Sequence, residues 1–181
     1  TNGLNKTALA ISPANTNEFY YLRQDGQLGK RLFSNYNQTV SRNLSNQHES
    51  QGGYNNTLAV SPVNKDLVLI GGVDVFKYDF SNGSINAFLD AYGTYNGNDN
   101  FYVHPDHHYL SFSPDGQTVY NGHDGGVHRG SINATQSSGG WTDLSNGLVI
   151  TQSYNIAITP QNDDYFMMAN QDNDGFSKTM V

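Results

Sequence analysis

The sequence predicts an all-β protein, a β-propeller, from three observations. The composition is poor in helix formers, because the 181 residues include 23 Asn, 14 Asp and 19 Gly but only two Glu. Asn, Asp and Gly favour turns over helices. A strand-like segment that ends in Pro recurs four times along the chain. Each copy is followed by a second apolar run and then by a turn that contains Gly, as expected for sheets of short antiparallel strands.

The repeated segment has the pattern large apolar, small, large apolar, Ser or Thr, Pro. Its copies are Leu9–Pro13, Leu58–Pro62, Leu110–Pro114 and Ile156–Pro160, and their prolines lie 49, 52 and 46 residues apart. Large residues two positions apart share one face of a strand. Pro cannot donate to a β-ladder and therefore ends the strand. We expect four equivalent strands, each ending in a turn.

The other strands follow in order within each repeat. Second strands are predicted at Phe19–Leu22, Leu67–Ile70, Val119–Tyr120 and Tyr165–Met168, and turns at Asp25-Gly26, Gly71-Gly72, Asp124-Gly125-Gly126 and Asp174-Gly175. Third strands are predicted at Val75–Phe80 and Val127–Arg129, and fourth strands at Ile85–Phe88 and Trp141-Thr142. Four strands in about 49 residues are typical of a propeller blade. A β-sandwich is the alternative, but its turns do not recur with this period.

The repeat divides the chain into blade units at about 1–50, 51–100, 101–150 and 151–181, and the last unit is incomplete. Propellers close with four to eight blades. We therefore expect a partial β-propeller with about four four-stranded blades, part of a six- to eight-bladed ring whose remaining blades belong to the same parent chain. A four-bladed ring completed by its terminal strands is the alternative.

Charge and composition exclude several functions. The net charge is −7, with only nine Lys and Arg, which argues against a nucleic-acid partner because such binding depends on cations that contact phosphates. No apolar run reaches the roughly 18 residues of a membrane span. Cysteine is absent, so disulfides and thiolate metal sites are excluded. The low charge and the abundance of Asn, Gly and Tyr favour a secreted or cell-surface protein.

The third repeat resembles the Asp-box (BNR) propellers, which include sialidases, xyloglucanase-like glycosidases and sortilin-type receptors. Their signature is a Ser-x-Asp-x-Gly-x-x-Trp hairpin between the third and fourth strands of a blade. Here Ser131, Asn133, Gly139 or Gly140, and Trp141 take those positions, with Asn in place of Asp and a longer hairpin. Ser81-Asn82-Gly83 matches part of the signature in the preceding unit. The resemblance implies a propeller fold.

A second resemblance extends from Val103 to Gly175. The stretches VHPDHHYLSFSPDG, YNGHDGGVHRG and NQDNDG are similar to those of large secreted propeller proteins of Bacteroidetes, many of which leave the cell by type IX secretion. This resemblance implies a location outside the cell. It says less about activity, because one fold supports many functions.

Histidine clustering predicts a divalent-cation site. Five of the six histidines lie between His104 and His128. His104, Asp106 and His108 alternate, so they share one strand face if this segment is extended, and His123 follows the second strand of the same unit. Imidazole and carboxylate together suit zinc or another transition metal. The alternative is that these side chains hydrogen-bond to neighbouring loops.

The last repeat contains a calcium-like pattern, Asn170-x-Asp172-x-Asp174-Gly175. These are the first ligand positions and the glycine of an EF-hand loop. Position twelve is Val181 instead of Glu, so a calcium site would need ligands from other loops. A turn stabilised by Asn and Asp side chains is the alternative.

Carboxylates and aromatic residues predict contact with sugars. Equivalent turns carry Asp25, Asp74, Asp124 and Asp172; these turns meet at one rim of a propeller, and glycoside hydrolysis requires two carboxylates. Turn conformation alone also explains these residues. Sialidase activity is not expected, since the four arginines form no recognisable triad. The connector before the third unit carries aromatic rings that suit sugar stacking or filling the space between blades: Tyr92, Tyr95, Phe101 and Tyr102.

These observations predict a secreted or cell-surface module that binds a glycan or another surface protein and is not catalytic in this segment. The residues expected to bind are Asp124, Asp172, Tyr92, Tyr95 and Tyr102, and those expected to hold a divalent cation are His104, Asp106, His108 and His123. One alternative is a xyloglucanase-like glycoside hydrolase whose carboxylates lie partly in blades outside this sequence. The other is a structural scaffold between modules.

Overall fold

The computed structural model describes residues 6–48, 51–90, 102–135, 139–148, 152–159, 162–170 and 175–179. Within these ranges the regular structure is β-strand, apart from the four-residue helix α1 (Ser45–His48). No helix in this part of the chain is long and apolar enough to cross a membrane. The chain forms two compact units, Thr1–Ser145 and Asn146–Val181. The prediction of an all-β protein is confirmed.

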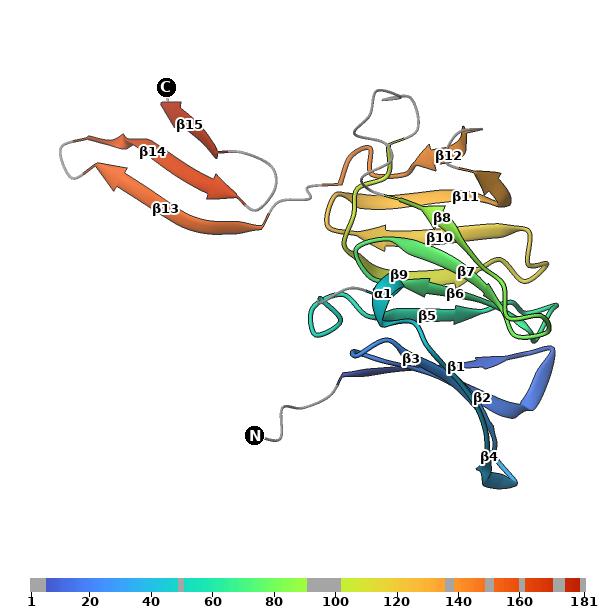
Figure 1. Cartoon of the computed structure of the whole chain (residues 1–181). Coiled ribbons are helices and arrows are strands. Elements are labelled where there is room, and N and C mark those ends of the chain that lie inside the picture. The colour runs from blue at the N-terminus through green and yellow to red at the C-terminus, as the bar shows by residue number, and fades with distance from the viewer. Residues whose placement is uncertain are drawn as a thin grey trace, which may run out of the picture. The chain divides into compact units, whose positions relative to one another are not determined.

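Three four-stranded antiparallel sheets build the first unit, each with its strands in chain order (Figure 1). The first sheet contains β1 (Thr7–Ser12), β2 (Asn15–Arg23), β3 (Gln27–Leu32) and β4 (Asn35–Asn43). The second contains β5 (Thr57–Val60), β6 (Leu67–Gly71), β7 (Val75–Asp79) and β8 (Ile85–Leu89). The third contains β9 (His107–Phe112), β10 (Thr118–His123), β11 (Gly126–Thr135) and β12 (Gly139–Asp143). Each sheet falls within one of the first three repeat units.

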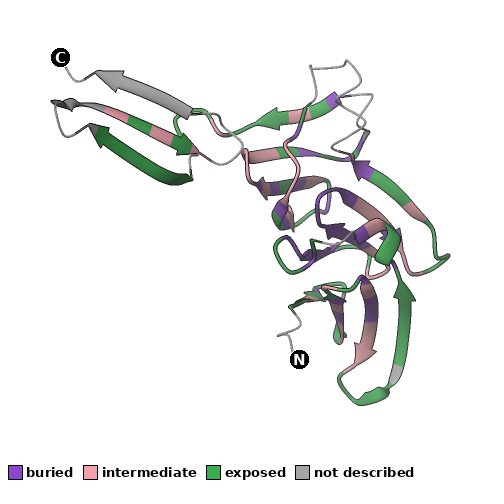
Figure 2. Ribbon diagram, turned by 60° about the vertical axis from the view of Figure 1, so that its left-hand side comes forward, coloured by how far each residue is buried: buried purple, intermediate pink, exposed green. Residues whose placement is uncertain are grey.

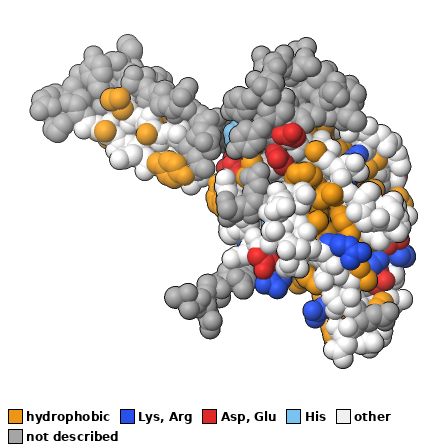
Figure 3. All heavy atoms as spheres, in the orientation of Figure 1, with side chains coloured by type: hydrophobic (Ala, Val, Ile, Leu, Met, Phe, Trp, Pro, Cys, Tyr) orange, Lys and Arg blue, Asp and Glu red, His pale blue; other side chains and the backbone are white. Residues whose placement is uncertain are grey.

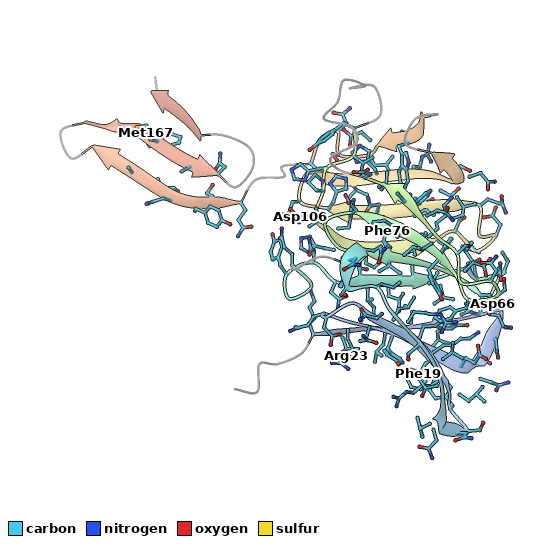
Figure 4. All side chains as sticks on the ribbon, in the orientation of Figure 1. Phe19, Arg23, Asp66, Phe76, Asp106 and Met167 are labelled. Atoms are coloured by element: carbon cyan, nitrogen blue, oxygen red, sulfur yellow. The ribbon has the colours of Figure 1, made fainter. Side chains whose placement is uncertain are left out.

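The second unit is a three-stranded antiparallel sheet of β13 (Ser153–Thr159), β14 (Asn162–Asn170) and β15 (Gly175–Thr179). It falls within the fourth repeat unit. Its apolar side chains Ile156, Ile158 and Met167 are exposed, and Figure 4 labels Met167 on β14.

The proline-terminated segments form the first strand of each sheet, and the predicted second strands lie within β2, β6, β10 and β14. In the first two sheets, the serine before the proline explains why the strand ends there. Ser12 Oγ accepts the backbone N–H of Ala14 (3.1 Å), and Ser61 Oγ accepts those of Val63 (3.4 Å) and Asn64 (3.2 Å). The hydroxyl thereby satisfies backbone donors that have left the ladder.

The sheets of the first unit pack face to face, with β5 between β1 and β9 (Figure 1). Leu58 and Val60 of β5 join a core with the first sheet, whereas Ala59 between them joins a core with the third sheet. This alternation follows from the two-residue period of a strand. Figure 2 shows the buried residues concentrated in this unit. The second repeat therefore directs its large residues toward the preceding sheet and its small residue toward the following one.

Antiparallel pairing gives the first unit two distinct ends. The proline end carries the turns after β1, β5 and β9. The loop end carries the β2–β3, β6–β7 and β10–β11 turns and the connectors that lead to β5 and β9. Figure 4 shows Asp66 at the proline end and Asp106 at the loop end. Among the described residues of this unit, those predicted to bind or to hold a metal belong to the loop end: Tyr102, His104, Asp106, His108, His123 and Asp124.

Leu58 and Leu9 occupy the same position of the repeated segment, yet Leu58 is 7 % exposed and Leu9 is 68 % exposed. We expect Leu58→Ala to lower the free energy of unfolding by about 2–4 kcal/mol, because it leaves a cavity in a packed core. Leu9→Ala is the matched control and should cost less than about 1 kcal/mol. Urea denaturation followed by Trp141 fluorescence measures both. Equal losses in the two variants would contradict the packing of β5 on the first sheet.

Candidate binding site at the loop end

All six histidines of the chain lie at the loop end of the first unit. They come from the two connectors, from the start of β9, and from both sides of the β10–β11 turn: His48, His104, His107, His108, His123 and His128. The stacking of sheets brings these segments together, because equivalent turns of adjacent sheets lie beside one another. His107 N–H donates to the carbonyl of Gly72 (2.8 Å), which joins the third sheet to the β6–β7 turn.

His123 is the centre of a group of imidazole rings. The His104 ring is stacked on the His123 ring, with centroids 6.0 Å apart and planes 9° from parallel. The His107 ring meets His123 edge-on at 5.9 Å, and the His128 ring lies 4.9 Å away. The structure therefore brings the predicted residues His104 and His123 together, along with two further histidines.

Hydrogen bonds define the tautomers of this group. The Gly125 backbone N–H donates to Nδ1 of His123 (3.1 Å), so this nitrogen carries no proton in the neutral ring. The proton of His123 is then on Nε2, which donates to Nδ1 of His128 (2.8 Å). Nδ1 of His107 donates to Oδ1 of Asn121 (3.0 Å). Both ring nitrogens of His123 are thus occupied by other protein groups.

Burial favours the neutral form of His107, His123 and His128. Burial lowers the pKa of His107 to about 4 and that of His123 to about 3, and the neighbouring histidines lower both further. Burial also lowers the pKa of His128 and of His48. A charged imidazole in this position would lose its hydration without gaining an anionic partner of equal strength. At neutral pH His107, His123 and His128 are therefore uncharged hydrogen-bonding rings.

A second cluster, here called the rim triad, consists of Tyr54, His108 and Asp124. Tyr54 Oη donates to Oδ2 of Asp124 (2.9 Å), and Nε2 of His108 donates to its Oδ1 (2.7 Å). The Tyr54 and His108 rings meet edge-on, with centroids 4.9 Å apart. Three segments supply the triad: the connector before β5, strand β9 and the β10–β11 turn. One carboxylate thus holds two aromatic side chains in place at the surface.

Asp106 joins the segments beneath the triad. Its backbone N–H donates to the carbonyl of Val73 (3.2 Å), its carbonyl accepts the N–H of Asp124 (3.3 Å), and its Oδ1 accepts from Asn55 Nδ2. The prediction that His104, Asp106 and His108 alternate along an extended strand is wrong. Strand β9 begins only at His107, and Asp106 has a left-handed φ of 62°, which breaks the alternation.

The other predicted residues are placed as follows. Tyr102 is 39 % exposed and its ring meets that of His104 edge-on at 6.2 Å. Asp25 and Asp74 lie in turns equivalent to that of Asp124, where Asp25 pairs with Arg23 at 2.6 Å. Several predicted residues lie outside the part of the chain that the structure describes: Tyr92, Tyr95, Phe101, Asp172 and Asp174.

Within the described ranges, no group of three or more His, Asp or Glu side chains is arranged to hold a metal ion. The residues expected to be ligands bond instead to other protein groups: His104 to the carbonyl of Pro105, Asp106 to Asn55, His108 to Asp124, and His123 to Gly125 and His128. The divalent cation stays a prediction. The residues of the Asp-box resemblance lie on the β11–β12 hairpin, where Trp141 packs edge-on against Phe88 at 5.3 Å.

Sequence patterns missed three residues of this site. Tyr54, Asn55 and His48 belong to the connector before β5, which has no periodic pattern. A signal was nevertheless present, because Asn55 and Asn56 directly precede an apolar strand, and polar residues at that point must find partners as the strand becomes buried. The connector therefore contributes more to the site than its composition indicates.

No family model matches this chain, and no curated protein matches it at a significant level.

The buried histidines make stability depend on pH. Histidine titrates near 6.5 in the unfolded chain. Because the pKa values of His107 and His123 are lower in the folded chain, the unfolded chain binds more protons than the folded chain below that pH. Stability is therefore complete above pH 6.5 and is lost as the pH falls toward 4. We expect the free energy of unfolding to decrease by about 2–4 kcal/mol between pH 7 and pH 5, as measured by urea denaturation.

The His107→Gln variant tests the cause of that decrease, because Gln keeps a donor for Asn121 but does not titrate. Between pH 7 and pH 5, the free energy of unfolding of this variant should decrease by about half as much as that of the wild type. A decrease as large as that of the wild type would show that titration elsewhere is responsible.

Proposed function

We propose that this chain is a segment of a secreted or cell-surface β-propeller whose loop end binds a glycan without hydrolysing it. The observation that carries this proposal is the rim triad, in which the Asp124 carboxylate holds Tyr54 and His108 together at the surface. The location outside the cell rests on the composition and on the resemblance to exported propeller proteins.

The sheet arrangement supports the propeller. Three successive repeats form four-stranded antiparallel sheets with strands in chain order, and their first strands are neighbours in space. A blade of a propeller has this strand order, and adjacent blades meet through their first strands around a common axis. A β-sandwich would instead distribute the strands of one repeat between two sheets. The repeat of about 49 residues agrees with the size of one blade.

The chemistry of the loop end supports a glycan ligand. Tyr54 is 44 % exposed, and His108 is also exposed. Aromatic rings offer an apolar surface to the C–H faces of sugars, while carboxylate and imidazole groups bond to hydroxyls. Hydrogen bonds already order the triad, so a ligand does not have to immobilise these side chains. The rim triad is thus a preorganised mixed aromatic and polar surface.

The environment of the carboxylates favours binding over hydrolysis. Glycoside hydrolysis needs one carboxyl group as the acid and a second as the base or nucleophile, both directed at the substrate. Asp124 is held by Tyr54 and His108, and Asp106 by Asn55. Hydrolysis remains the second candidate, because the backbones of Asp106 and Asp124 are joined by a hydrogen bond and bring two carboxylates to one place.

The proposed glycan site predicts that Tyr54 contributes to the affinity for the ligand. After a glycan array identifies a ligand for the 181-residue chain, calorimetry should show that Tyr54→Ala weakens binding about five- to tenfold, because an aromatic surface is lost. Tyr54→Phe, which keeps the ring but releases Asp124, should have a smaller effect. Tyr36→Ala, on an exposed tyrosine of β4 at the proline end, is the matched control and should leave affinity unchanged. Equal affinity of Tyr54→Ala and wild type would refute the proposed site.

Incubation of the same glycan with the wild-type chain, followed by measurement of reducing ends, separates binding from hydrolysis. We expect no release above the buffer blank. Release of reducing ends by the wild type that is lost in Asp124→Asn would favour a glycoside hydrolase over the non-catalytic binding proposal.

A further inference from the structure

Asp106 is the one residue other than glycine with a left-handed backbone among those that the structure describes, with a φ of 62°. A left-handed backbone is unfavourable for a residue with a Cβ atom, and it persists where several contacts hold it in place. Such residues are concentrated at binding sites. Asp106 lies directly before β9 at the loop end, where Figure 4 labels it. Its conformation therefore points to a role in the loop-end site.

Asp106 is connected to all three segments that supply the rim triad. The connector before β5 reaches it through Asn55, the neighbour of Tyr54, whose Nδ2 donates to Asp106 Oδ1. The β10–β11 turn reaches it through Asp124, whose backbone N–H donates to the carbonyl of Asp106 (3.3 Å). His108 follows Asp106 by two residues in β9. One residue thus joins the segments whose side chains meet at the surface.

We propose that Asp106 is the positioning residue of the loop-end site, and that its left-handed backbone and its carboxylate together hold the rim triad in shape. The carboxylate and the carbonyl of this one residue accept hydrogen bonds from two different segments. The left-handed backbone directs both groups to their donors at once. The inference rests on the proposed glycan-binding function and assigns the residue that orders its site.

The second sheet fixes the position of Asp106. The backbone N–H of Asp106 donates to the carbonyl of Val73 (3.2 Å), and that of His107 donates to the carbonyl of Gly72 (2.8 Å), both in the β6–β7 turn. Asn55 is fully buried, so its bond to the Asp106 carboxylate is shielded from water, which strengthens it. The arrangement of Asp106 therefore follows from the stacking of the sheets and is set before any ligand arrives.

Packing alone does not order the rim triad, because Tyr54 and His108 are exposed. Figure 3 shows acidic and histidine side chains at the surface of this end of the first unit. An exposed side chain keeps its rotamer freedom unless other contacts restrain it. Asp124 restrains both rings of the triad, and the backbone of Asp124 is bonded to that of Asp106. Loss of the arrangement at Asp106 should therefore release all three side chains.

Three substitutions separate the contributions of the backbone and the carboxylate. Asn accepts a left-handed backbone and keeps an oxygen for Asn55, Gly accepts the backbone but lacks the oxygen, and Ala provides neither. We expect an intact rim triad in Asp106→Asn, a partly disordered one in Asp106→Gly and the most disordered one in Asp106→Ala. Asp115→Ala, which removes a hydrogen-bonded carboxylate at the proline end, is the matched control and should behave as wild type.

The nuclear Overhauser effect between the rings of Tyr54 and His108, whose centroids lie 4.9 Å apart, measures the order of the triad in the absence of a ligand. It should be retained in Asp106→Asn, weakened in Asp106→Gly and lost in Asp106→Ala. Thermal unfolding establishes that each variant is folded. If Asp106→Ala does not fold, Asp106→Gly decides the test, because glycine adopts this backbone without strain.

Binding of the labelled chain to a printed array of neutral oligosaccharides tests whether this order contributes to affinity. Asp106→Ala should weaken binding about fivefold, the factor that corresponds to the cost of a left-handed backbone in a residue other than glycine. In a Tyr54→Ala background, the same substitution should weaken binding less than about twofold further, because the ring that Asp106 positions is absent. A residue that only stabilises the fold would lower binding equally in both backgrounds.

Three results would overturn the inference: an unchanged Overhauser effect in the folded Asp106→Ala and Asp106→Gly variants, equal damage in Asp106→Asn and Asp106→Ala, or equal losses of binding in the two backgrounds. Unchanged array binding by Asp106→Ala despite a lost Overhauser effect would also overturn the positioning role and leave glycan binding in place. Failure of the wild-type chain to bind any oligosaccharide, with the Overhauser series as expected, would refute the proposed function and retain Asp106 as the residue that orders the triad.

Discussion

The structure depends on one constraint: the central sheet has apolar residues on both faces, and both faces must be covered. On one face of this sheet, Leu58 and Val60 are buried in the core shared with the first sheet. On the other face, Ala59 and Leu69 are buried in the core shared with the third sheet. A single sheet cannot meet this requirement, because its second face would stay in water. Repetition of the unit meets it, since each sheet covers the next. The small residue in the middle of the repeated segment leaves room for the neighbouring sheet to approach closely.

Stacking also explains why the loop end is rich in buried polar groups. Equivalent turns of adjacent sheets come together there, and the connectors must cross them to start the next sheet. His107, Asn121 and His123 are buried as a result, and each needs a partner inside the protein. The rings satisfy one another instead of water, and desolvation keeps them neutral. The same arrangement positions the more exposed Tyr54, His108 and Asp124 above this layer, so the site at the surface is supported by a network that titrates only well below neutral pH.

The sequence predicted elements whose apolar pattern and turn residues agree, and it missed contacts that depend on tertiary packing. The first strands were predicted because proline and the preceding serine or threonine mark where each one ends. Strand β4 was not predicted, because its sequence NYNQTVSRN is mostly polar and it forms by pairing with β3 from Asn43 to Asn35. The histidine cluster was visible in the spacing, but Tyr54 was not, since it reaches Asp124 across 70 positions of the chain. The left-handed conformation of Asp106 likewise has no signal in the pattern, and it broke the predicted alternation.

The two outer faces of the first unit differ in a way that follows from the repeat. The open face of the first sheet presents Leu9 and Ile11, which occupy the positions of Leu58 and Val60, and with Phe19 and Phe33 they line an apolar groove of about 490 Å³. A contiguous apolar surface of this kind marks an interaction site in a soluble protein. Its residues are those that contact the preceding sheet in the next two repeats, which supports the proposed propeller, where another sheet covers them. The strand register of the third sheet places Arg129 at the position that Lys30 and Lys77 occupy in the first two sheets. Lys30 bonds to Asp66 and Lys77 donates to the carbonyl of Ile132, each in the following sheet. The repeat therefore explains both faces: apolar residues face the preceding sheet, and a cation faces the following one.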